Sequence, residues 1–269
     1  MRTVNGCQVL LQAHRGVSTE YPENTLAAFQ AACDQGYDLI ELDPKFTKDG
    51  ACVALHDRTV NRTGRTASGE ALTQARAISD MTLAEARALE YGSWKDARFA
   101  GEPLPLLCEV FSLARERRMP LKLDNVIESF DEAQTQALFD LAEEAELGEL
   151  LGFTCVRLSY LERVASRFPQ ATIHYDGPVD AARLAEIAAR AKGRRLIVWM
   201  PFENRLTSWC KTPPLDEERV RLARRLGAQV GAWILEDEGE LRQVCERYRV
   251  DVVETTGSLK PDGWKENGK

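Results

Sequence analysis

Residues 8–43 have the sequence QVLLQAHRGVSTEYPENTLAAFQAACDQGYDLIELD. Two short apolar runs, QVLLQAH (8–14) and YDLIELD (37–43), enclose a segment whose apolar residues recur every three or four positions. Short apolar runs are typical of buried parallel strands, and the period between them is typical of an amphipathic helix. This part of the chain therefore predicts a β-α-β unit in which both strands end on polar side chains.

The same alternation continues along the whole chain. Six further apolar runs are candidate strands: PLKLDN (120–125), LGFTCV (151–156), ATIHYD (171–176), RLIVWM (195–200), QVGAWIL (229–235) and DVVET (251–255). Helical patterns occur at 23–36, 106–118, 131–146, 159–168, 180–191, 215–226 and 236–247. Eight strands, each followed by a helix, predict an α/β fold, a closed (β/α)8 TIM barrel. The rival doubly wound sheet lacks its usual GxGxxG signal after the first strand.

One connection is much longer than the others. Residues 57–103 separate the second predicted strand from its helix. They predict an insertion at the carboxyl end of the barrel, where active sites form. A small helix is expected within 79–92, with Thr82 as its N-cap and Glu85 completing a capping box. CVALHD (52–57) is a candidate short strand at the start of this region.

Composition narrows the class of protein. The chain has 269 residues, with 35 Lys plus Arg, 42 Asp plus Glu and a formal net charge of −7. This excludes a disordered or collagenous chain, and the acidity argues against nucleic acid as a partner. With no linker or repeat, we expect a single catalytic barrel domain over 1–269. The seven cysteines lack CxxC spacing, and neither a signal peptide nor a membrane anchor is recognisable, so we expect a cytoplasmic protein.

Three carboxylates lie where predicted strands end. Glu41 and Asp43 are two residues apart, so both side chains point to the same side of the second strand. Asp124 ends the third strand and can converge on them. Like charges that face one point repel unless a cation lies between them, and oxygen ligands favour Mg²⁺, Ca²⁺ or Mn²⁺ over zinc. The alternative is that these acids cap helices or face water.

The chain has three histidines, His14, His56 and His174, and each lies at or just after the end of a predicted strand. His14 shares the parity of Gln12, opposite the apolar residues Val9, Leu11 and Ala13, so it points inward if those residues pack on the outer helices. A histidine pair beside a phosphate offers one proton acceptor and one donor near neutral pH. Arg15 can bind an anionic oxygen through its planar fork. A lone histidine is more often a solvated or satisfied side chain.

Six motifs occur in a characteristic order and spacing: AHRG (13–16), PENTLAAF (22–29), ELD (41–43), TKDG (47–50), LHDRTVNRTG (55–64) and LPLLCEV (104–110). Together they resemble the glycerophosphodiester phosphodiesterase family. The resemblance is specific over 8–64, weaker over 104–130 and faint beyond, with partial echoes at Trp233 and at the end of the last strand.

The resemblance implies a (β/α)8 barrel with an insertion after the second strand. It implies one divalent cation, Mg²⁺ or Ca²⁺ or else Mn²⁺, bound by Glu41, Asp43 and the acid of the third strand. It also implies His14 and His56 as the general acid/base pair, in either assignment, and Arg15 as a phosphate ligand. The implied reaction is hydrolysis of a small-molecule glycerophosphodiester to glycerol 3-phosphate and an alcohol.

The third strand departs from the family pattern. Its usual ending, Glu-x-Lys, is replaced by LKLDNV, so Asp124 is the acid and Val126 stands at the lysine position. Lys122 has the parity of Asp124, but it lies about 6.6 Å deeper in the barrel and can pair with the carboxylates instead. The missing cationic contact with the substrate would then come from elsewhere, from His174 or Arg157.

Several side chains are interpreted as support for this site. Trp233 matches the family's aromatic position and is expected to line the substrate pocket, together with His174. For Trp199, packing inside the barrel is an equal alternative. Glu23 is a candidate partner near the histidines, and Arg62 is interpreted as structural and not catalytic.

Two other functions stay open at this stage. Related phospholipase-D-type barrels of venoms use a similar site to make a cyclic phosphate, although the long insertion argues against this. A barrel that only binds a phosphorylated ligand would account for Asp124 and Val126, although both histidines and both acids of the second strand argue for catalysis. The leaving alcohol and the oligomeric state are not determined.

Overall fold

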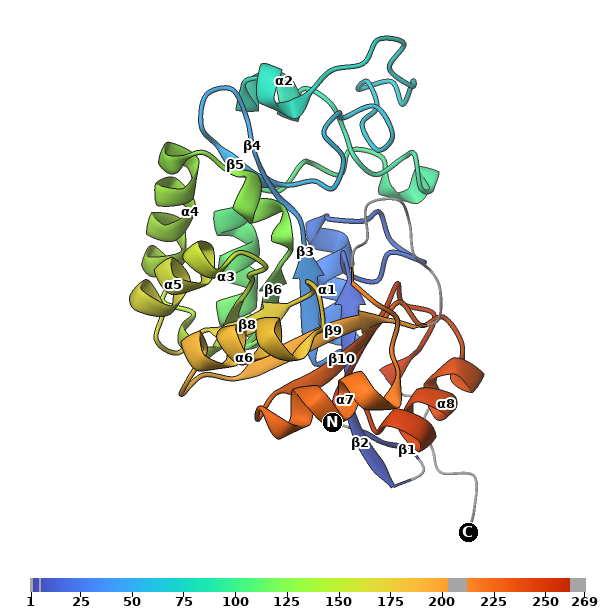
Figure 1. Cartoon of the computed structure of the whole chain (residues 1–269). Coiled ribbons are helices and arrows are strands. Elements are labelled where there is room, and N and C mark those ends of the chain that lie inside the picture. The colour runs from blue at the N-terminus through green and yellow to red at the C-terminus, as the bar shows by residue number, and fades with distance from the viewer. Residues whose placement is uncertain (1, 5, 203–211, 262–269) are drawn as a thin grey trace.

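Eight parallel strands form a closed barrel within the described part of this computed structural model, residues 2–4, 6–202 and 212–261. The order around the barrel is β2-β11-β10-β9-β8-β7-β6-β3, and β3 pairs back to β2 (Figure 1). The strands are β2 (Cys7–His14), β3 (Leu39–Leu42), β6 (Leu121–Leu123), β7 (Leu151–Thr154), β8 (Thr172–Tyr175), β9 (Leu196–Pro201), β10 (Gln229–Trp233) and β11 (Val252–Thr255). All eight predicted strands are present, so the predicted TIM barrel is confirmed.

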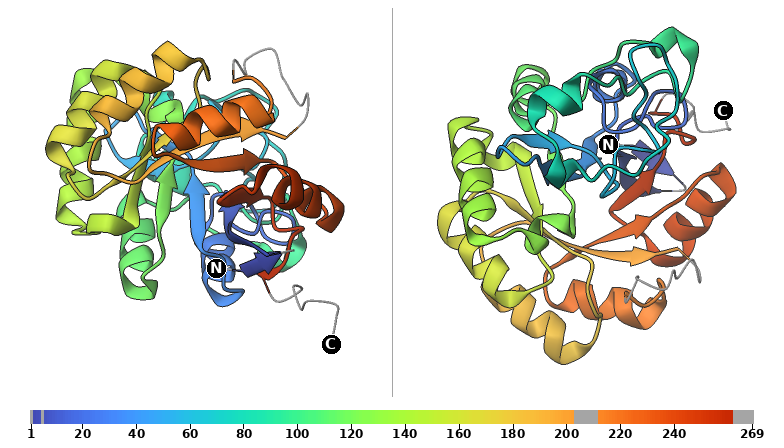
Figure 2. Two further views of the ribbon diagram at one scale, coloured as in Figure 1. Left: turned by 60° about the horizontal axis from the view of Figure 1, so that its bottom comes forward. Right: turned by 90° about the horizontal axis from the view of Figure 1, so that it is seen from above.

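Helices follow the first seven of these strands and lie outside the barrel (Figure 2). They are α1 (Leu26–Asp34), α3 (Leu107–Arg117), α4 (Glu132–Glu144), α5 (Leu158–Arg167), α6 (Ala181–Arg190), α7 (Glu217–Arg225) and α8 (Glu238–Tyr248). No α-helix follows β11 as far as residue 261, so the expected helix after every strand is wrong at this point. The chain turns back there instead, and the carbonyl of Leu259 accepts a hydrogen bond from Tyr37 at 2.7 Å.

The inward side chains change from apolar to polar along the strands. An apolar cluster fills one part of the interior: Leu10, Leu39, Ile197, Trp199, Trp233 and Val252. The next inward residue of the same strand is polar in three cases: Gln12 after Leu10, Glu41 after Leu39 and Glu254 after Val252. Because side chains alternate across a strand, this change places the polar residues toward the carboxyl ends.

The predicted insertion is a folded unit over the carboxyl end of the barrel (Figure 1). It follows an antiparallel hairpin of β4 (Pro44–Phe46) and β5 (Cys52–Ala54). The predicted small helix is α2 (Leu83–Arg87), and Thr82 caps it with the predicted capping box. Short 3-10 turns form η1 (Ile78–Asp80) and η2 (Ala97–Phe99). A separate hydrophobic cluster stabilises the insertion: Val53, Leu55, Val60, Ile78, Met81, Ala86, Tyr91 and Leu104.

Three short elements complete the described chain. β1 (Arg2–Val4) pairs antiparallel with the start of β2, while η3 (Asn125–Ser129) follows β6 and η4 (Gly148–Leu150) precedes β7. Over the described residues, no helix has the length and apolar character needed to cross a membrane.

Candidate active site

His14 and Glu41 meet at the carboxyl ends of neighbouring strands. They are partners in the register of β2 and β3, and His14 Nε2 lies 3.8 Å from Glu41 Oε2. The backbone N–H of Arg15 donates to the same carboxylate oxygen at 3.0 Å. Burial, helped by the charges of Arg15 and Lys122, lowers the pKa of His14 to about 3. The ring is therefore neutral near pH 7 and points inward, as the parity of β2 predicts.

Arg15 joins two acids immediately after β2. Its Nε lies 3.3 Å from Asp43 Oδ2, and its Nη1 donates to Glu23 Oε1 at 3.0 Å. Asn24 Nδ2 donates to Asp43 Oδ2 at 2.8 Å, which fixes the same carboxylate from another side. The turn passes close to α1 at Gly16, where a Cβ would stand 2.7 Å from the helix backbone. Glycine is thus required for the loop that carries Arg15.

His56 is held by a chain of charged contacts that begins at Arg15. Glu23 bridges Arg15 and Arg62, because Arg62 donates to both of its carboxylate oxygens at 2.7 Å. Arg62 Nε also donates to Asp57 Oδ2 at 2.7 Å. Asp57 Oδ1 in turn lies 2.7 Å from His56 Nδ1. Glu23 is thus connected to His56, as expected, and the connection runs through Arg62 and Asp57.

The tautomer of His56 follows from Asp57. Burial acts to raise the pKa of Asp57, but the hydrogen bonds from Arg62 and His56 lower it to about 2. An ionised carboxylate only accepts hydrogen bonds, so His56 Nδ1 must donate. The second ring nitrogen, Nε2, is therefore the one available to a substrate, and the side chain is 42% exposed.

Asp43 and Asp124 lie side by side at the ends of β3 and β6. The parallel register brings them together, and the N–H of Asp124 donates to the carbonyl of Leu42 at 3.0 Å. Burial raises the pKa of Glu41 well above its usual range, and the carboxylates of Asp43 and Glu254 raise it further. Over the described residues, no three His, Cys, Asp or Glu side chains form a ready-made metal site. The metal set of Glu41, Asp43 and Asp124 stays a prediction.

A buried ion pair lies among the inward side chains. Lys122 Nζ donates to Glu254 Oε2 at 3.3 Å, and Gln12 Nε2 donates to the same oxygen. All three side chains are almost completely buried. The expected pairing of Lys122 with a carboxylate is thus present, but its partner Glu254 comes from β11. Glu254 was not among the predicted site residues, and its signal was an acid that follows Val252 and Val253 in the run DVVET (251–255).

His174 and the tryptophans line the interior of the barrel. His174 is 1% exposed, and its Nδ1 accepts a hydrogen bond from Trp199 Nε1 at 2.9 Å. Trp199 is fully buried, so of its two interpretations the structure supports packing. Trp233 is half-buried and packs against the same apolar cluster. Substrate contacts of His174 and Trp233 stay predictions.

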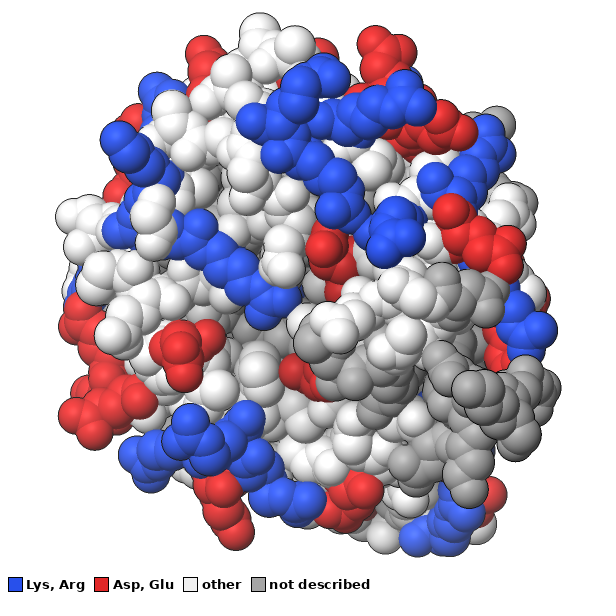
Figure 3. Space-filling view, turned by 90° about the horizontal axis from the view of Figure 1, so that it is seen from below, with Lys and Arg blue, Asp and Glu red and all other residues white. Residues whose placement is uncertain are grey.

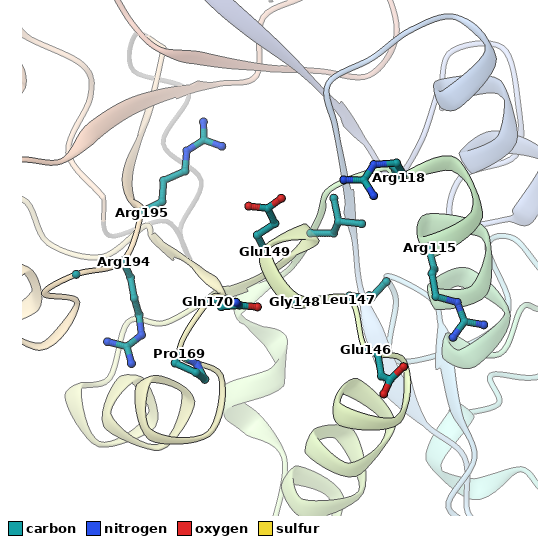
Figure 4. Close-up of a pocket in the computed structure, with 12 residues that line it drawn as sticks. Arg115, Arg118, Glu146, Leu147, Gly148, Glu149, Pro169, Gln170, Arg194 and Arg195 are labelled. Atoms are coloured by element: carbon teal, nitrogen blue, oxygen red, sulfur yellow. The ribbon is translucent and has the colours of Figure 1, made fainter.

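A polar hollow lies at the end of the barrel opposite His14. Seen from below, this face carries interspersed basic and acidic side chains (Figure 3). The hollow has a volume of about 650 Å³, and the end of α3 and the segments that precede β7 to β9 line it with Arg115, Arg118, Glu149 and Arg195 (Figure 4). Barrel enzymes carry their chemistry at the carboxyl ends of the strands. We therefore assign the candidate active site to the end that carries His14.

Comparisons with known proteins agree with this geometry. The model of the glycerophosphoryl diester phosphodiesterase family matches residues 14–256. A glycerophosphodiester phosphodiesterase from Caldanaerobacter subterraneus is 44% identical over 110 residues, which cover 41% of this chain and 42% of that protein. One from Bacillus subtilis is 33% identical over 98 residues, which cover 36% of this chain and 31% of that protein. The chain thus spans less than half the length of these curated relatives.

The barrel itself is shared with solved structures. A phosphodiesterase from Oleispira antarctica, solved in complex with the product sn-glycerol-3-phosphate, matches with a TM-score of 0.72 at 23% identity. The match covers 93% of this chain and 94% of that one, and it shows a common fold. The family model shows more than a common fold, because its match is to the sequence. It extends from His14 at the end of β2 to the residue after β11. Because the family model matches most of the chain, the chain belongs to the glycerophosphoryl diester phosphodiesterase family.

Proposed function

We propose that the protein is a metal-dependent phosphodiesterase that hydrolyses a glycerophosphodiester to glycerol 3-phosphate and an alcohol. The observation that carries the proposal is the contact of His14, Arg15, Glu41 and Asp43 at the mouth of a barrel of this family. The chain of charged contacts from Arg15 to His56 adds the second histidine. Together these residues supply groups that bind an anion and groups that exchange protons.

The acids at the mouth fit one divalent cation. Glu41, Asp43 and Asp124 offer only carboxylate oxygens, which suit Mg²⁺, Ca²⁺ or Mn²⁺. The raised pKa of Glu41 reflects the burial of this group and its repulsion by neighbouring carboxylates, which a cation would relieve. When bound, the cation would neutralise charge on the nonbridging oxygens of the phosphodiester.

The histidines and Arg15 have distinct roles in the proposed reaction. Arg15 binds a phosphate oxygen through its guanidinium group. His14, whose Nε2 lies at the mouth beside Glu41, accepts the proton of the attacking water while the water oxygen bonds to phosphorus. The bond from phosphorus to the alcohol oxygen then breaks, and the imidazolium form of His56, with Nδ1–H on Asp57, donates its Nε2 proton to the leaving alkoxide. Asp57 keeps Nδ1 of His56 occupied during this transfer.

The test is turnover of a panel of glycerophosphodiesters with Mg²⁺, Ca²⁺, Mn²⁺ or a chelator, with released glycerol 3-phosphate as the readout. We expect release that requires a divalent cation and stops with the chelator. Replacing His14 or His56 with Ala should lower turnover by roughly 100-fold or more while the fold is retained. Near-normal turnover in both variants would contradict the assignment of the histidines.

The same assay separates the two alternatives. A cyclic phosphate in place of the free monoester would indicate that the substrate's own hydroxyl attacks phosphorus. Tight binding of glycerol 3-phosphate without turnover of any diester would indicate a binding barrel. Metal-dependent release of the monoester by the wild-type protein supports neither of them.

We also propose a cytoplasmic location. The six cysteines that lie among the described residues are free thiols, and most of them are buried. Free thiols are typical of the reducing cytoplasm, whereas secreted domains rely on disulfides. Fractionation of cells that produce the full-length protein tests this location, and recovery with the membrane or the medium would contradict it.

A further inference from the structure

Lys45 lies on the extended chain that carries two of the acids at the mouth. The chain passes from β3 to β4 with only one residue, Asp43, between the two strands. Side chains of an extended chain alternate, so Glu41, Asp43 and Lys45 share one side. Their neighbours Pro44 and Phe46 are buried on the other side, whereas Lys45 is half-buried.

The surroundings of Lys45 place its charge at the mouth of the barrel. Its cross-strand partner is Val53, which is buried in the hydrophobic cluster of the insertion. Cross-strand partners share a face, so the apolar stem of Lys45 lies on the side of that cluster. Asp43 lies two residues earlier on the same side of this chain, and Asp124 follows β6, which pairs with β3. The carboxylates on this side of the chain are therefore those of the proposed catalytic cluster.

Lys45 differs from the neighbouring cations Arg15 and Lys122, because it forms no ion pair among the described residues. Arg15 pairs with Asp43 and Glu23, and Lys122 pairs with Glu254. In the parts of the chain that the structure describes, the Lys45 ammonium group forms no ion pair with a carboxylate. A half-buried ammonium without a partner is costly to desolvate, so it favours an anion that enters the site. A lysine binds a phosphate as a flexible point charge.

Neither of the other two predicted sources of a cation supplies one here, because Arg157 is paired and His174 is buried. Arg157 Nε lies 3.5 Å from Glu128 Oε2, and His174 is buried beside Trp199. Val126, where a lysine would be expected from the resemblance, lies on η3, and β4 packs against η3. Lys45 therefore approaches the same part of the mouth from the neighbouring element.

We propose that the ammonium group of Lys45 binds a nonbridging phosphoryl oxygen of the substrate and of the glycerol 3-phosphate product. This inference rests on the proposed function, and it adds a phosphate-binding residue to that site. Because the contact is made before and after the bond breaks, its loss raises KM and weakens product binding more than it lowers kcat.

The test compares Lys45→Met with the matched control Lys48→Met, whose lysine is exposed on the loop that follows β4. At saturating divalent cation, we expect Lys45→Met to raise KM and to weaken glycerol 3-phosphate binding by roughly 10- to 100-fold. Binding is measured by isothermal titration calorimetry. Lys45→Arg should keep both values within about fivefold of the wild type, and Lys48→Met within about twofold. An unchanged thermal midpoint confirms that the fold is retained.

The outcomes distinguish this inference from the proposed function. If the wild type hydrolyses a diester and Lys45→Met behaves like it, the role of Lys45 is wrong and the function stands. If the wild type hydrolyses nothing but binds glycerol 3-phosphate, and Lys45→Met binds it less well, the role of Lys45 stands and the function is wrong. If the wild type neither hydrolyses a diester nor binds glycerol 3-phosphate, both are wrong.

Discussion

Arg62 lies between Glu23 and Asp57, and its guanidinium group determines where the carboxylate beside His56 is held. Replacement by Met keeps an apolar stem but removes these contacts. We expect kcat to fall roughly 10- to 100-fold with a smaller change in KM, because a misplaced proton donor slows the chemical step. Steady-state kinetics on the best diester of the panel measure this split.

The matched control for Arg62 is Arg76→Met in the same insertion. Arg76 Nη2 lies 3.7 Å from the exposed Glu85 Oε1, and such a surface pair contributes little. We expect kinetics within about twofold of the wild type. Equal losses in both variants would show that Arg62 acts only through the stability of the insertion.

His174 predicts a pH dependence of stability. Burial lowers its pKa in the folded protein well below the ordinary value of 6.5. As the pH falls below 6.5, the unfolded chain binds a proton that the folded protein does not, so the stability present above this pH is lost. His174→Asn removes this titration while its amide can still accept the bond from Trp199. Between about pH 7.5 and pH 5.5, urea unfolding should show a loss of stability about 1 kcal/mol smaller in the variant than in the wild type. Equal losses in the two proteins would contradict a neutral buried His174.

At the scale of elements, α2 is a helix of five residues whose first turn depends on its cap. Thr82 Oγ1 accepts a hydrogen bond from the N–H of Glu85, and the Glu85 carboxylate accepts from the N–H of Thr82 at 2.8 Å. Thr82→Ala should lower the free energy of unfolding by about 1 kcal/mol, whereas Thr82→Ser keeps the oxygen and most of the stability. Urea denaturation measures both variants, and equal losses would argue against the cap.

Elements were predicted well wherever a local pattern defines them. The cap of α2 lies within four consecutive residues, and the strands are apolar runs bounded by polar turns. Strand ends were less accurate: Tyr37 and Asp38 precede β3, although the run 37–43 includes them. Asp38 nevertheless contacts β2: its N–H donates to the carbonyl of Leu11, and its carboxylate accepts from the N–H of Leu11, a contact with no local signature.

At the scale of the whole molecule, Lys122 and Glu254 join β6 and β11 inside the barrel. Lys122→Met leaves the Glu254 carboxylate buried without its cation, and we expect it to lower the free energy of unfolding by about 3–5 kcal/mol. The double variant, which also carries Glu254→Gln, lacks the orphaned charge. It should regain at least half of the free energy of unfolding that Lys122→Met loses. Chemical denaturation of the two single variants and the double variant measures the coupling. A loss below about 1 kcal/mol in Lys122→Met would contradict a strong pair.

The candidate site was predicted only in part. His14, Arg15, Glu41 and Asp43 follow from strand ends and motifs, and the structure brings them into contact. Glu254 was missed, as was the link from Arg62 through Asp57, because each contact depends on segments that are distant along the chain or on an irregular loop. The lack of a carboxylate partner for Lys45 is likewise a property of three-dimensional distances.

The sequence alone determined the order and type of the elements, the inward parity of His14 and the family. These depend on the spacing of apolar residues and on motifs that span a few residues. The tertiary structure decided which charges meet. Closure of the barrel brings Gln12 of β2 next to Glu254 of β11, which is 242 residues away along the chain. Such partners are chosen by burial and by the free-energy cost of an unpaired charge, which only the folded chain imposes.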